Sequence, residues 1–343
     1  MTSDRASMYR VSFDTQEVQT TERLDYWVDK IEAFFDIEKP APETIRLGFE
    51  GSLSLLQCSD IIFGEVHSQG QLYTRDRKRL ILDGLDHFIL QIFLEGGGPI
   101  DEGPVIQPGD MLIIDMGRAH ARDSWPHRTL SFVIPRDRDP ELTALLDRMH
   151  EKRLPASHPF VRMIFSQMSQ LWELQGDMSL AQMSTAMDST LEFFKSVVTS
   201  DQTLDIEGRS ALASPALAHS IRCYIDANLG DDLGAEALCQ RFRISRAQLY
   251  RIFADHGGVM RYVQQRRLVR SYRGLSQSGL DQSVFGIAAA LGFKSESHFT
   301  RVFKAEFGQT PSEVKRDGLL RSADQEGSRT LVDAWLRDLA QVR

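Results

Sequence analysis

The sequence predicts a multidomain α+β protein, in which an N-terminal β-barrel with flanking helices precedes an all-α C-terminal domain with a double helix-turn-helix. Three observations support this prediction: short apolar runs separated by turn residues, a later change to helical spacing, and a duplicated segment near the C-terminus. A chain of 343 residues is too long for one ordinary hydrophobic core, so two domains are expected. Its 42% hydrophobic and 26% charged residues are typical of packed globular domains.

One amphipathic helix and a series of short strands are expected in the first part of the chain. Apolar residues recur at helical spacing from Leu24 to Phe35, and Pro40 and Pro42 end that pattern. Later apolar runs are short, and turn residues such as Pro108-Gly109-Asp110 separate them. The predicted strands are residues 52–57, 61–67, 88–94, 111–115 and 130–134. Many short strands with regular turns favour a barrel or jelly roll.

Two longer helices are expected next, near Pro159–Leu174 and Ser179–Val198. The second carries an apolar stripe at steps of three and four residues, formed by Leu180, Met183, Met187, Leu191, Phe194 and Val198. Such a stripe usually packs into a core, although an exposed part of it would suit the seam of a homodimer.

Composition sets the expected domain limits. Residues 200–214 are polar and lack apolar periodicity, which predicts a linker. We therefore expect a β-rich domain over residues 1–199 and a helical domain over residues 215–318. Residues 319–343 form a C-terminal tail with one weak helical pattern, to which we assign no function.

The helical part contains two similar segments, Leu238–Phe253 and Ile287–Phe303. Their early positions match at an offset of 49 residues and their later ones at 50, so the second copy has one additional residue in its turn. Each copy is expected to form two short helices joined by a tight turn. Ser245 is the predicted N-cap of the second helix in the first copy, because its hydroxyl can accept from a free backbone N–H.

The second helix of each copy leaves a polar outer face that is suited to a DNA major groove. Arginine can donate two hydrogen bonds to guanine, hydroxyls bond to phosphates or bases, and alanine can contact a thymine methyl group. The predicted DNA-binding residues are Ser245, Arg246, Ala247, Gln248, Tyr250 and Arg251 in the first copy, and Ser295, Ser297, His298, Thr300, Arg301 and Lys304 in the second.

A helix over Tyr262–Leu275 is expected to join the copies and to fix the distance between the two groove-facing helices. The two helices would then enter successive major-groove segments, about 34 Å apart. A helical bundle that does not bind DNA is the alternative that periodicity alone leaves open.

Charge is distributed unevenly, which fits an interaction with nucleic acid. The chain has a net charge of −8, but residues 215–320 hold 15 basic and 10 acidic residues, a net of +5. The rest of the chain therefore carries −13. A cationic domain suits phosphate binding, and an acidic partner domain limits non-specific binding to DNA.

The segment Leu291–Pro311, with the sequence LGFKSESHFTRVFKAEFGQTP, resembles the signature of AraC/XylS-family transcription regulators. Arg266–Arg270 resembles the start of that family's linker helix, and the resemblance covers residues 215–316. By motif, the family's groove-reading positions correspond to Ala247, Tyr250 and Arg251 in the first copy, and to Ser297, His298 and Arg301 in the second.

The first copy departs from the family pattern at two positions. Arg243 stands where the family often has glycine in the turn, and a non-glycine residue in left-handed conformation costs about 1–2 kcal/mol. Ala247 is small for a groove-reading position. The second copy is therefore the more family-like of the two.

The N-terminal part resembles the cupin-like β-barrel sensor domain of one branch of this family. Asp86–Gly96 and Pro108–Asp115 carry that resemblance, which implies a small-molecule pocket or a dimerisation surface. Arg75, His87 and Arg118 are the polar residues that we predict to meet an acidic effector inside the barrel; the alternative is that they lie on outward strand faces.

These observations favour a ligand-responsive transcription activator whose partners are double-stranded DNA, RNA polymerase and a small-molecule effector. A cytoplasmic location is expected, because the chain begins with no secretory signal and has no apolar run of the ~20 residues that a membrane span needs. Cys58, Cys223 and Cys239 lie far apart, so a zinc site or a disulfide framework is not expected.

Two other functions are weighed against this one. The first is a metal-dependent cupin enzyme with an accessory helical domain, but His67, His87, His120 and His127 are scattered and no His-x-His pair occurs. We expect no catalytic residue, metal or cofactor, since no nucleophile or phosphate-loop motif is present. The second is an interaction module whose repeat is only a scaffold.

Overall fold

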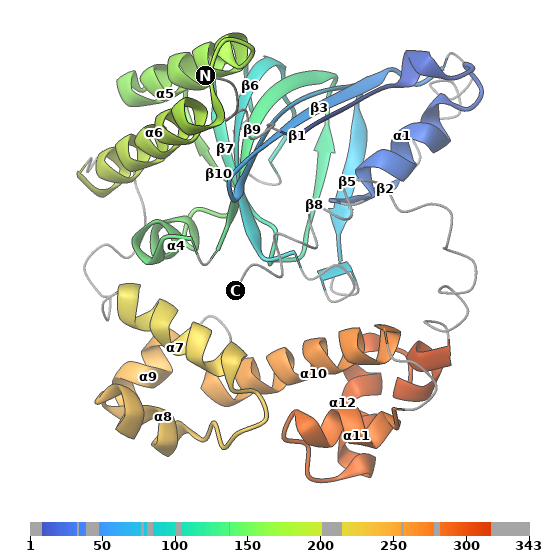
Figure 1. Ribbon diagram of the computed structural model, residues 1–343, viewed down its shortest axis with the longest axis vertical. Coiled ribbons are helices and arrows are strands. Elements are labelled where there is room, and N and C mark those ends of the chain that lie inside the picture. The colour runs from blue at the N-terminus through green and yellow to red at the C-terminus, as the bar shows by residue number, and fades with distance from the viewer. Residues whose placement is uncertain are drawn as a thin grey trace, which may run out of the picture. The chain divides into compact units, whose positions relative to one another are not determined.

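The structure is a computed structural model that divides the chain into a sheet-rich unit and a helical unit (Figure 1). It describes residues 9–316 except for 33, 39–47, 77–78, 81–84, 101–103, 137, 201–214, 255–256 and 278–281. Among the described residues, the sheet-rich unit spans 9–200 and the helical unit 215–316. The predicted linker and tail lie almost wholly outside the described residues, so the predicted domain limits stay predictions.

Antiparallel strands form two sheets in the sheet-rich unit. The larger sheet has the order β1-β3-β4-β9-β6-β7-β10, and the smaller has the order β2-β5-β8. The strands are β1 (Tyr9–Asp14), β2 (Asp36–Glu38), β3 (Gly51–Cys58), β4 (Ile61–Ser68), β5 (Gln71–Arg75), β6 (His87–Gly96), β7 (Met111–Asp115), β8 (His120–Ser124), β9 (His127–Pro135) and β10 (Lys152–Leu154).

The two faces of the larger sheet belong to separate hydrophobic cores. On the outer face, residues such as Leu90 and Phe132 pack beneath α4 (Pro140–Leu146), α5 (Pro159–Leu174) and α6 (Leu180–Ser200) (Figure 1). On the inner face, alternate residues such as Ile89 and Val133 pack toward the smaller sheet and α1 (Arg23–Ile31). Because both faces of its central strands are covered, these strands are apolar along most of their length.

Several sequence predictions are confirmed here. All five predicted strands are present as β3, β4, β6, β7 and β9, and the helices predicted near 159–174 and 179–198 are α5 and α6. The apolar stripe on α6 is buried from Met183 to Val198, so it packs into the core rather than forming an exposed seam. Strands β1, β2, β5, β8 and β10 were not predicted. The α+β class is confirmed, whereas the cupin-like identity of the N-terminal part stays a prediction.

The helical unit contains the predicted double helix-turn-helix. Its elements are α7 (Pro215–Ala227), α8 (Ala235–Phe242), α9 (Arg246–Ile252), α10 (Val259–Gln277), α11 (Val284–Ala290) and α12 (Glu296–Phe307), followed by a helical turn over residues 311–316. Helices α7, α8 and α9 share one core, and α11 and α12 share another. Among the described residues, no helix is both long and apolar enough to cross a membrane.

Candidate nucleic-acid interface

The first helix-turn-helix consists of α8 and α9, joined by a turn at Arg243. Arg243 has φ 53° and ψ 46°, the left-handed conformation that its position in the repeat predicted. Ser245 caps α9 as predicted, because its hydroxyl accepts from the backbone N–H of Gln248. Leu249 and Phe253 are completely buried, so the opposite face of α9 points to solvent.

The second helix-turn-helix, α11 and α12, has more favourable local geometry. Ser283 caps α11 and Ser295 caps α12, and the turn between them contains Gly292 at φ +82°. Beneath α12, neighbouring phenylalanine rings lie 4.4–5.2 Å apart along the helix, in the series Phe293, Phe299, Phe303 and Phe307. These tilted and edge-to-face contacts fix the buried side of α12 and therefore its exposed side.

The predicted DNA-binding residues gather on these two exposed faces. Ten of the twelve are exposed, and Gln248 and Thr300 are half-buried. Tyr250 is 50% exposed, which is unusual for so large an aromatic side chain. Arg246 lies 3.4 Å from Glu236, but both side chains are exposed, so this ion pair contributes little to stability. Contact of these residues with DNA stays a prediction.

Helix α10 belongs to both cores of the helical unit. Its first half packs with α8 and α9 and its second half with α11 and α12, through Val259, Tyr262 and Val263 on one side and Leu268, Tyr272 and Leu275 on the other. The ring of Tyr272 stacks on Phe303 of α12 at 5.8 Å, and Tyr262 contacts Phe253 at 5.0 Å. One continuous helix thus sets the separation of α9 and α12, as the sequence predicted.

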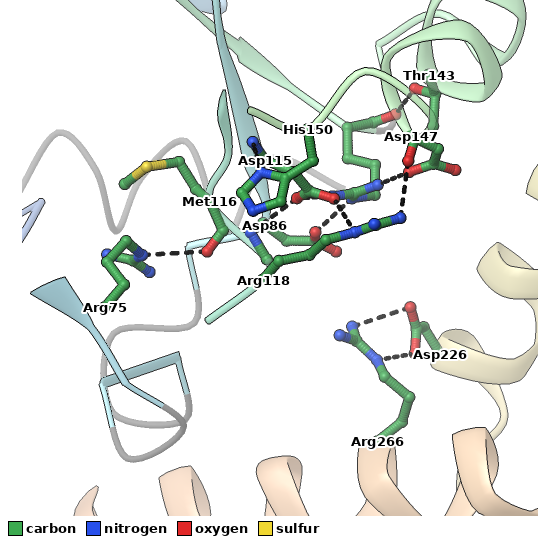
Figure 2. A network of polar contacts seen from close by, with 12 residues as sticks. Arg75, Asp86, Asp115, Met116, Arg118, Thr143, Asp147, His150, Asp226 and Arg266 are labelled. Atoms are coloured by element: carbon green, nitrogen blue, oxygen red, sulfur yellow. Dashed lines mark hydrogen bonds and ion pairs between the residues drawn. The ribbon is translucent and has the colours of Figure 1, made fainter. Parts of the chain in front are cut away.

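Arg266 and Arg267 of α10 reinforce this connection. Arg266 forms a two-pronged ion pair with Asp226 of α7, at 2.6 and 2.9 Å (Figure 2). Arg267 donates to the backbone oxygens of Leu229 and Asp231, in the loop before α8, at 2.8 and 2.6 Å. A side chain at Gly292 would meet the Arg267 guanidinium at 2.7 Å, so the turn of the second copy packs directly on this arginine.

The loop before α8 also approaches the second copy directly. A Cβ atom added at Gly230 would lie 2.6 Å from the backbone oxygen of Ala290, at the end of α11. This joint between the copies was not predicted, because its backbone contacts leave no pattern in the sequence. The sequence shows an arginine, Arg267, in the middle of α10, but it does not indicate which backbone carbonyl groups this arginine binds.

The three residues predicted to meet an effector lie in the sheet-rich unit and have protein partners. Arg75 is fully buried and donates to the backbone oxygens of Met116 and Phe34. Arg118 pairs with Asp115 at 3.1 Å and donates to the backbone oxygen of Asp147 (Figure 2). His87 is buried at the start of β6. None of the three lines either of the two cavities described for this unit.

One of these cavities lies between the two sheets, and its volume is about 70 Å³. Apolar residues of the larger sheet and of the end of α1 form most of its wall, and Tyr73, Gln91, His120, Arg122, His127 and Ser131 form its polar part. Sequence reasoning missed Tyr73 and Arg122 because it did not recognise β5 and β8 as strands.

The histidines of the sheet-rich unit form no metal site in the part of the chain that the structure describes. Those residues include no group of three or more His, Cys, Asp or Glu side chains that could hold a metal ion. Burial lowers the pKa of His120 and of His127 to about 4, and both are therefore neutral at physiological pH.

Known proteins share the helical unit. A family described as a helix-turn-helix domain matches residues 238–317. The HTH-type transcriptional activator RhaS of Escherichia fergusonii is 28% identical over 136 residues, which are 39% of this chain and 48% of RhaS. The probable transcription factor PqrA of Proteus vulgaris is 33% identical over 87 residues, which are 25% of this chain and 70% of PqrA. The chain thus matches about half the length of RhaS.

A solved structure shares the fold over most of the chain. The crystal structure of the AraC-like transcriptional activator CuxR aligns with a TM-score of 0.53 and 19% identity, covering 78% of this chain and 96% of CuxR. The fold, the helix-turn-helix match and the match to most of PqrA together show that this chain belongs to the AraC/XylS family of transcription regulators.

Proposed function

We propose that this protein is a sequence-specific DNA-binding transcription regulator, and that it is a cytoplasmic, ligand-responsive activator that contacts RNA polymerase. The observation that carries the proposal is a pair of polar helix faces, on α9 and α12, held by one helix that belongs to both cores.

The chemistry of the two faces suits the reading of base pairs. Arg251 on α9 and Arg301 on α12 are exposed, and each can donate two parallel hydrogen bonds to the O6 and N7 atoms of guanine. Lys304 lies one turn beyond Arg301 on the exposed side of α12, where it can contact a phosphate. The two faces therefore offer both base contacts and backbone contacts.

The rigidity of the connection supports recognition of a fixed spacing. Helix α10 packs into both cores, and Arg267 and Gly230 join the two copies directly. Since the copies cannot easily change their separation, two half-sites about one helical turn apart, roughly 10 base pairs, are expected.

The first experiment is selection of random duplex DNA on the purified protein, followed by sequencing of the retained DNA. We expect an enriched motif with two half-sites about 10 base pairs apart. Inserting five base pairs between the half-sites rotates them to opposite sides of the duplex and should abolish the gain from the second half-site. Enrichment of no sequence, with and without candidate effectors, contradicts the proposal.

Salt dependence provides a second test of the same function. A protein that neutralises six to ten phosphates loses about 10³–10⁵ in affinity between 50 and 200 mM salt. A scaffold that does not bind DNA has no such dependence, which separates the proposal from the interaction-module alternative. The metal-enzyme alternative finds no ligand cluster among the described residues to support it.

Ligand response and the oligomeric state depend on the sheet-rich unit. The cavity between the sheets supports a small-molecule effector, because its lining is mostly apolar with a few convergent polar groups. A homodimer would need a surface other than the α6 stripe, since that stripe is buried within the unit. Sedimentation of the purified protein with and without its DNA site measures the oligomeric state.

A further inference from the structure

On β5 and β8, the inner face of the smaller sheet carries only polar side chains. Residues directly opposite each other on β5 and β8 point to the same side, and their pairs are Gln71 with Ser124, Tyr73 with Arg122, and Arg75 with His120. Five of the six are at most 9% exposed. A buried polar wall is costly unless its groups find partners, so each group needs an explanation.

Protein partners account for most of this wall. Gln71 accepts from the Trp27 indole at 3.0 Å and donates to the hydroxyls of Ser68 and Tyr73, both at 2.6 Å. Ser124 donates to the backbone oxygen of Gln71 at 2.9 Å. Arg75 donates to two backbone carbonyl groups, as described above.

Arg122 is the exception. It is 9% exposed and lines the cavity, and its guanidinium carbon lies 5.8 Å from the Phe93 ring centroid. One terminal nitrogen lies 3.5 Å from the Gln91 side-chain oxygen, a weak hydrogen bond. The other terminal nitrogen, Nη1, is buried and has no hydrogen-bond partner among the described residues.

No carboxylate within the cavity balances this charge. The described lining contains no Asp or Glu, and His120 and His127 are neutral. Their Nδ1 atoms lie 3.1 and 2.9 Å from the backbone oxygens of Arg118 and Trp125, which leaves each Nε2 as an acceptor in the neutral ring. Arg122 also lines a second cavity, together with Asp123 and Glu151, and Glu151 attracts it there. No ion pair joins Arg122 to either carboxylate among the described residues.

The opposite wall, formed by the larger sheet, is mostly apolar, with Gln91, His127 and Ser131 as its polar members. Leu53, Leu55, Val66, Ile89 and Val133 face the cavity from the larger sheet. A ligand there must therefore combine an anionic group with an apolar body.

We propose that the cavity binds an organic monocarboxylate whose carboxylate is received by Arg122 and whose apolar part lies against the larger sheet. A single planar guanidinium with an unused N–H matches one carboxylate. The site is independent of DNA binding, but its role as the effector site rests on the proposed function.

The test uses two acids and their uncharged amides as probes: 3-phenylpropionate and 3-phenylpropanamide, and decanoate and decanamide. Binding to the full-length protein is measured by isothermal titration calorimetry. We expect at least one acid to bind saturably and its amide to bind at least about tenfold more weakly, because the amide loses the charge-assisted contact. Whichever acid binds more tightly, 3-phenylpropionate or decanoate, shows whether the cavity prefers an aromatic or an aliphatic ligand.

Two variants locate the site. R122M should lose at least about tenfold in affinity for that acid, since the fork of donors is removed. R128M is the matched control: Arg128 lies on β9 outside the lining, paired with Glu65 at 2.6 Å, and its loss should leave acid binding unchanged. If R122M fails to fold, the comparison of acids with amides on the wild-type protein still decides the question.

The proposal is overturned if neither acid binds at millimolar concentration, if acid and amide bind equally, or if folded R122M retains acid binding. DNA binding is measured separately, by fluorescence anisotropy on the selected duplex. Specific DNA binding without acid binding refutes this inference alone. Acid binding without specific DNA binding refutes the proposed function and leaves the carboxylate site standing.

Discussion

Arg122 in the sheet-rich unit and Arg301 in the helical unit both lack a carboxylate partner among the residues that the structure describes, yet their surroundings are opposite. Arg122 is 9% exposed inside a cavity, whereas Arg301 is exposed on the outer face of α12. Water solvates the second cation but not the first, so only the first reduces the stability of the free protein.

This difference implies that loss of a functional arginine affects the stability of the two units differently. Removing a functional residue from an exposed helix face should weaken binding and leave folding unchanged. Removing a functional residue from the interior should weaken ligand binding but stabilise the protein. A buried polar group without a full set of hydrogen-bond partners destabilises the folded state, and its removal ends that cost. Each prediction below tests or sharpens this comparison.

The largest effect is expected at Arg136, an arginine whose side chain is only 15% exposed and which has the carboxylate partners that Arg122 lacks. Arg136 contacts the carboxylates of Asp86, Asp115 and Asp147, and its guanidinium carbon lies 4.1 Å from the Phe88 ring centroid. Burial alone would lower the pKa of Arg136, but the three carboxylates outweigh it and raise that pKa. R136M should therefore lower the unfolding free energy by about 3–5 kcal/mol, because three carboxylates lose their cation.

The matched variant R122M should instead raise the unfolding free energy, by about 1 kcal/mol or more, because it removes a buried donor without a partner. Denaturant unfolding of both variants measures the contrast. Equal destabilisation by R136M and R122M would show that Arg122 has a structural partner, and the comparison between the two units would then fail.

The second effect concerns pH. Burial is the main cause that lowers the pKa of His120 and His127 to about 4 and that of His150 to about 3. The unfolded chain has histidine pKa values near 6.5, so between about pH 6.5 and 4 it binds more protons than the folded protein. The unfolding free energy of the sheet-rich unit should therefore fall as pH drops through that window.

The expected loss is on the order of 3 kcal/mol for the most buried of these histidines, His127. Burial raises the pKa of Asp115, which acts in the opposite direction and reduces the total loss. In the helical unit His298 is exposed, so that unit should depend less on pH over the same range. Thermal unfolding from pH 7 to 4.5 should separate two transitions, with the sheet-rich one moving first; a shared shift contradicts the comparison.

The third prediction concerns DNA binding. R251A and R301A should each weaken binding to the selected duplex by about 1–3 kcal/mol and relax specificity at one base pair. Their unfolding free energies should stay within about 0.5 kcal/mol of the wild-type value, because both side chains are exposed. R162A, at an exposed arginine of α5, is the matched control and should retain DNA affinity. A stability loss as large as the binding loss would make the effect structural.

The same contrast explains which features could be predicted from the sequence. Strands β6 and β9 are covered on both faces, so their apolar runs were visible as strands. Strands β5 and β8, with the sequences QLYTR and HARDS, bury a polar face, and their few apolar residues resemble those of a loop. The polar inner face of β5 and β8 therefore hid these strands from sequence analysis, and the same polar face is what suits them to bind a ligand.

In the helical unit the signals were local. The repeat, the Ser245 cap and the left-handed turn depend on neighbouring residues, so each was predicted from the sequence and is present. The contacts of Arg267 with the loop before α8 depend on the packing of distant segments, and no sequence spacing indicates them. One pattern in the sequence could have indicated the polar interior: polar residues alternate along β9 at His127, Thr129 and Ser131, which places them on one face of the strand.

The smallest effect is expected for glycine in place of Arg243, in the left-handed turn of the first helix-turn-helix copy. Arg243 adopts the left-handed conformation at a cost of about 1–2 kcal/mol. Glycine at this position would remove that cost, but it would lose about 0.5–1 kcal/mol more conformational entropy on folding. R243G should therefore stabilise the unit by about 0.5–1 kcal/mol, whereas G292A should destabilise it by about 1–2 kcal/mol or more, because its Cβ meets Arg267. Hydrogen exchange of the α8–α9 amides should slow in R243G. If it does not, the first copy is held by its contacts with α7 and α10 and the turn contributes no measurable strain.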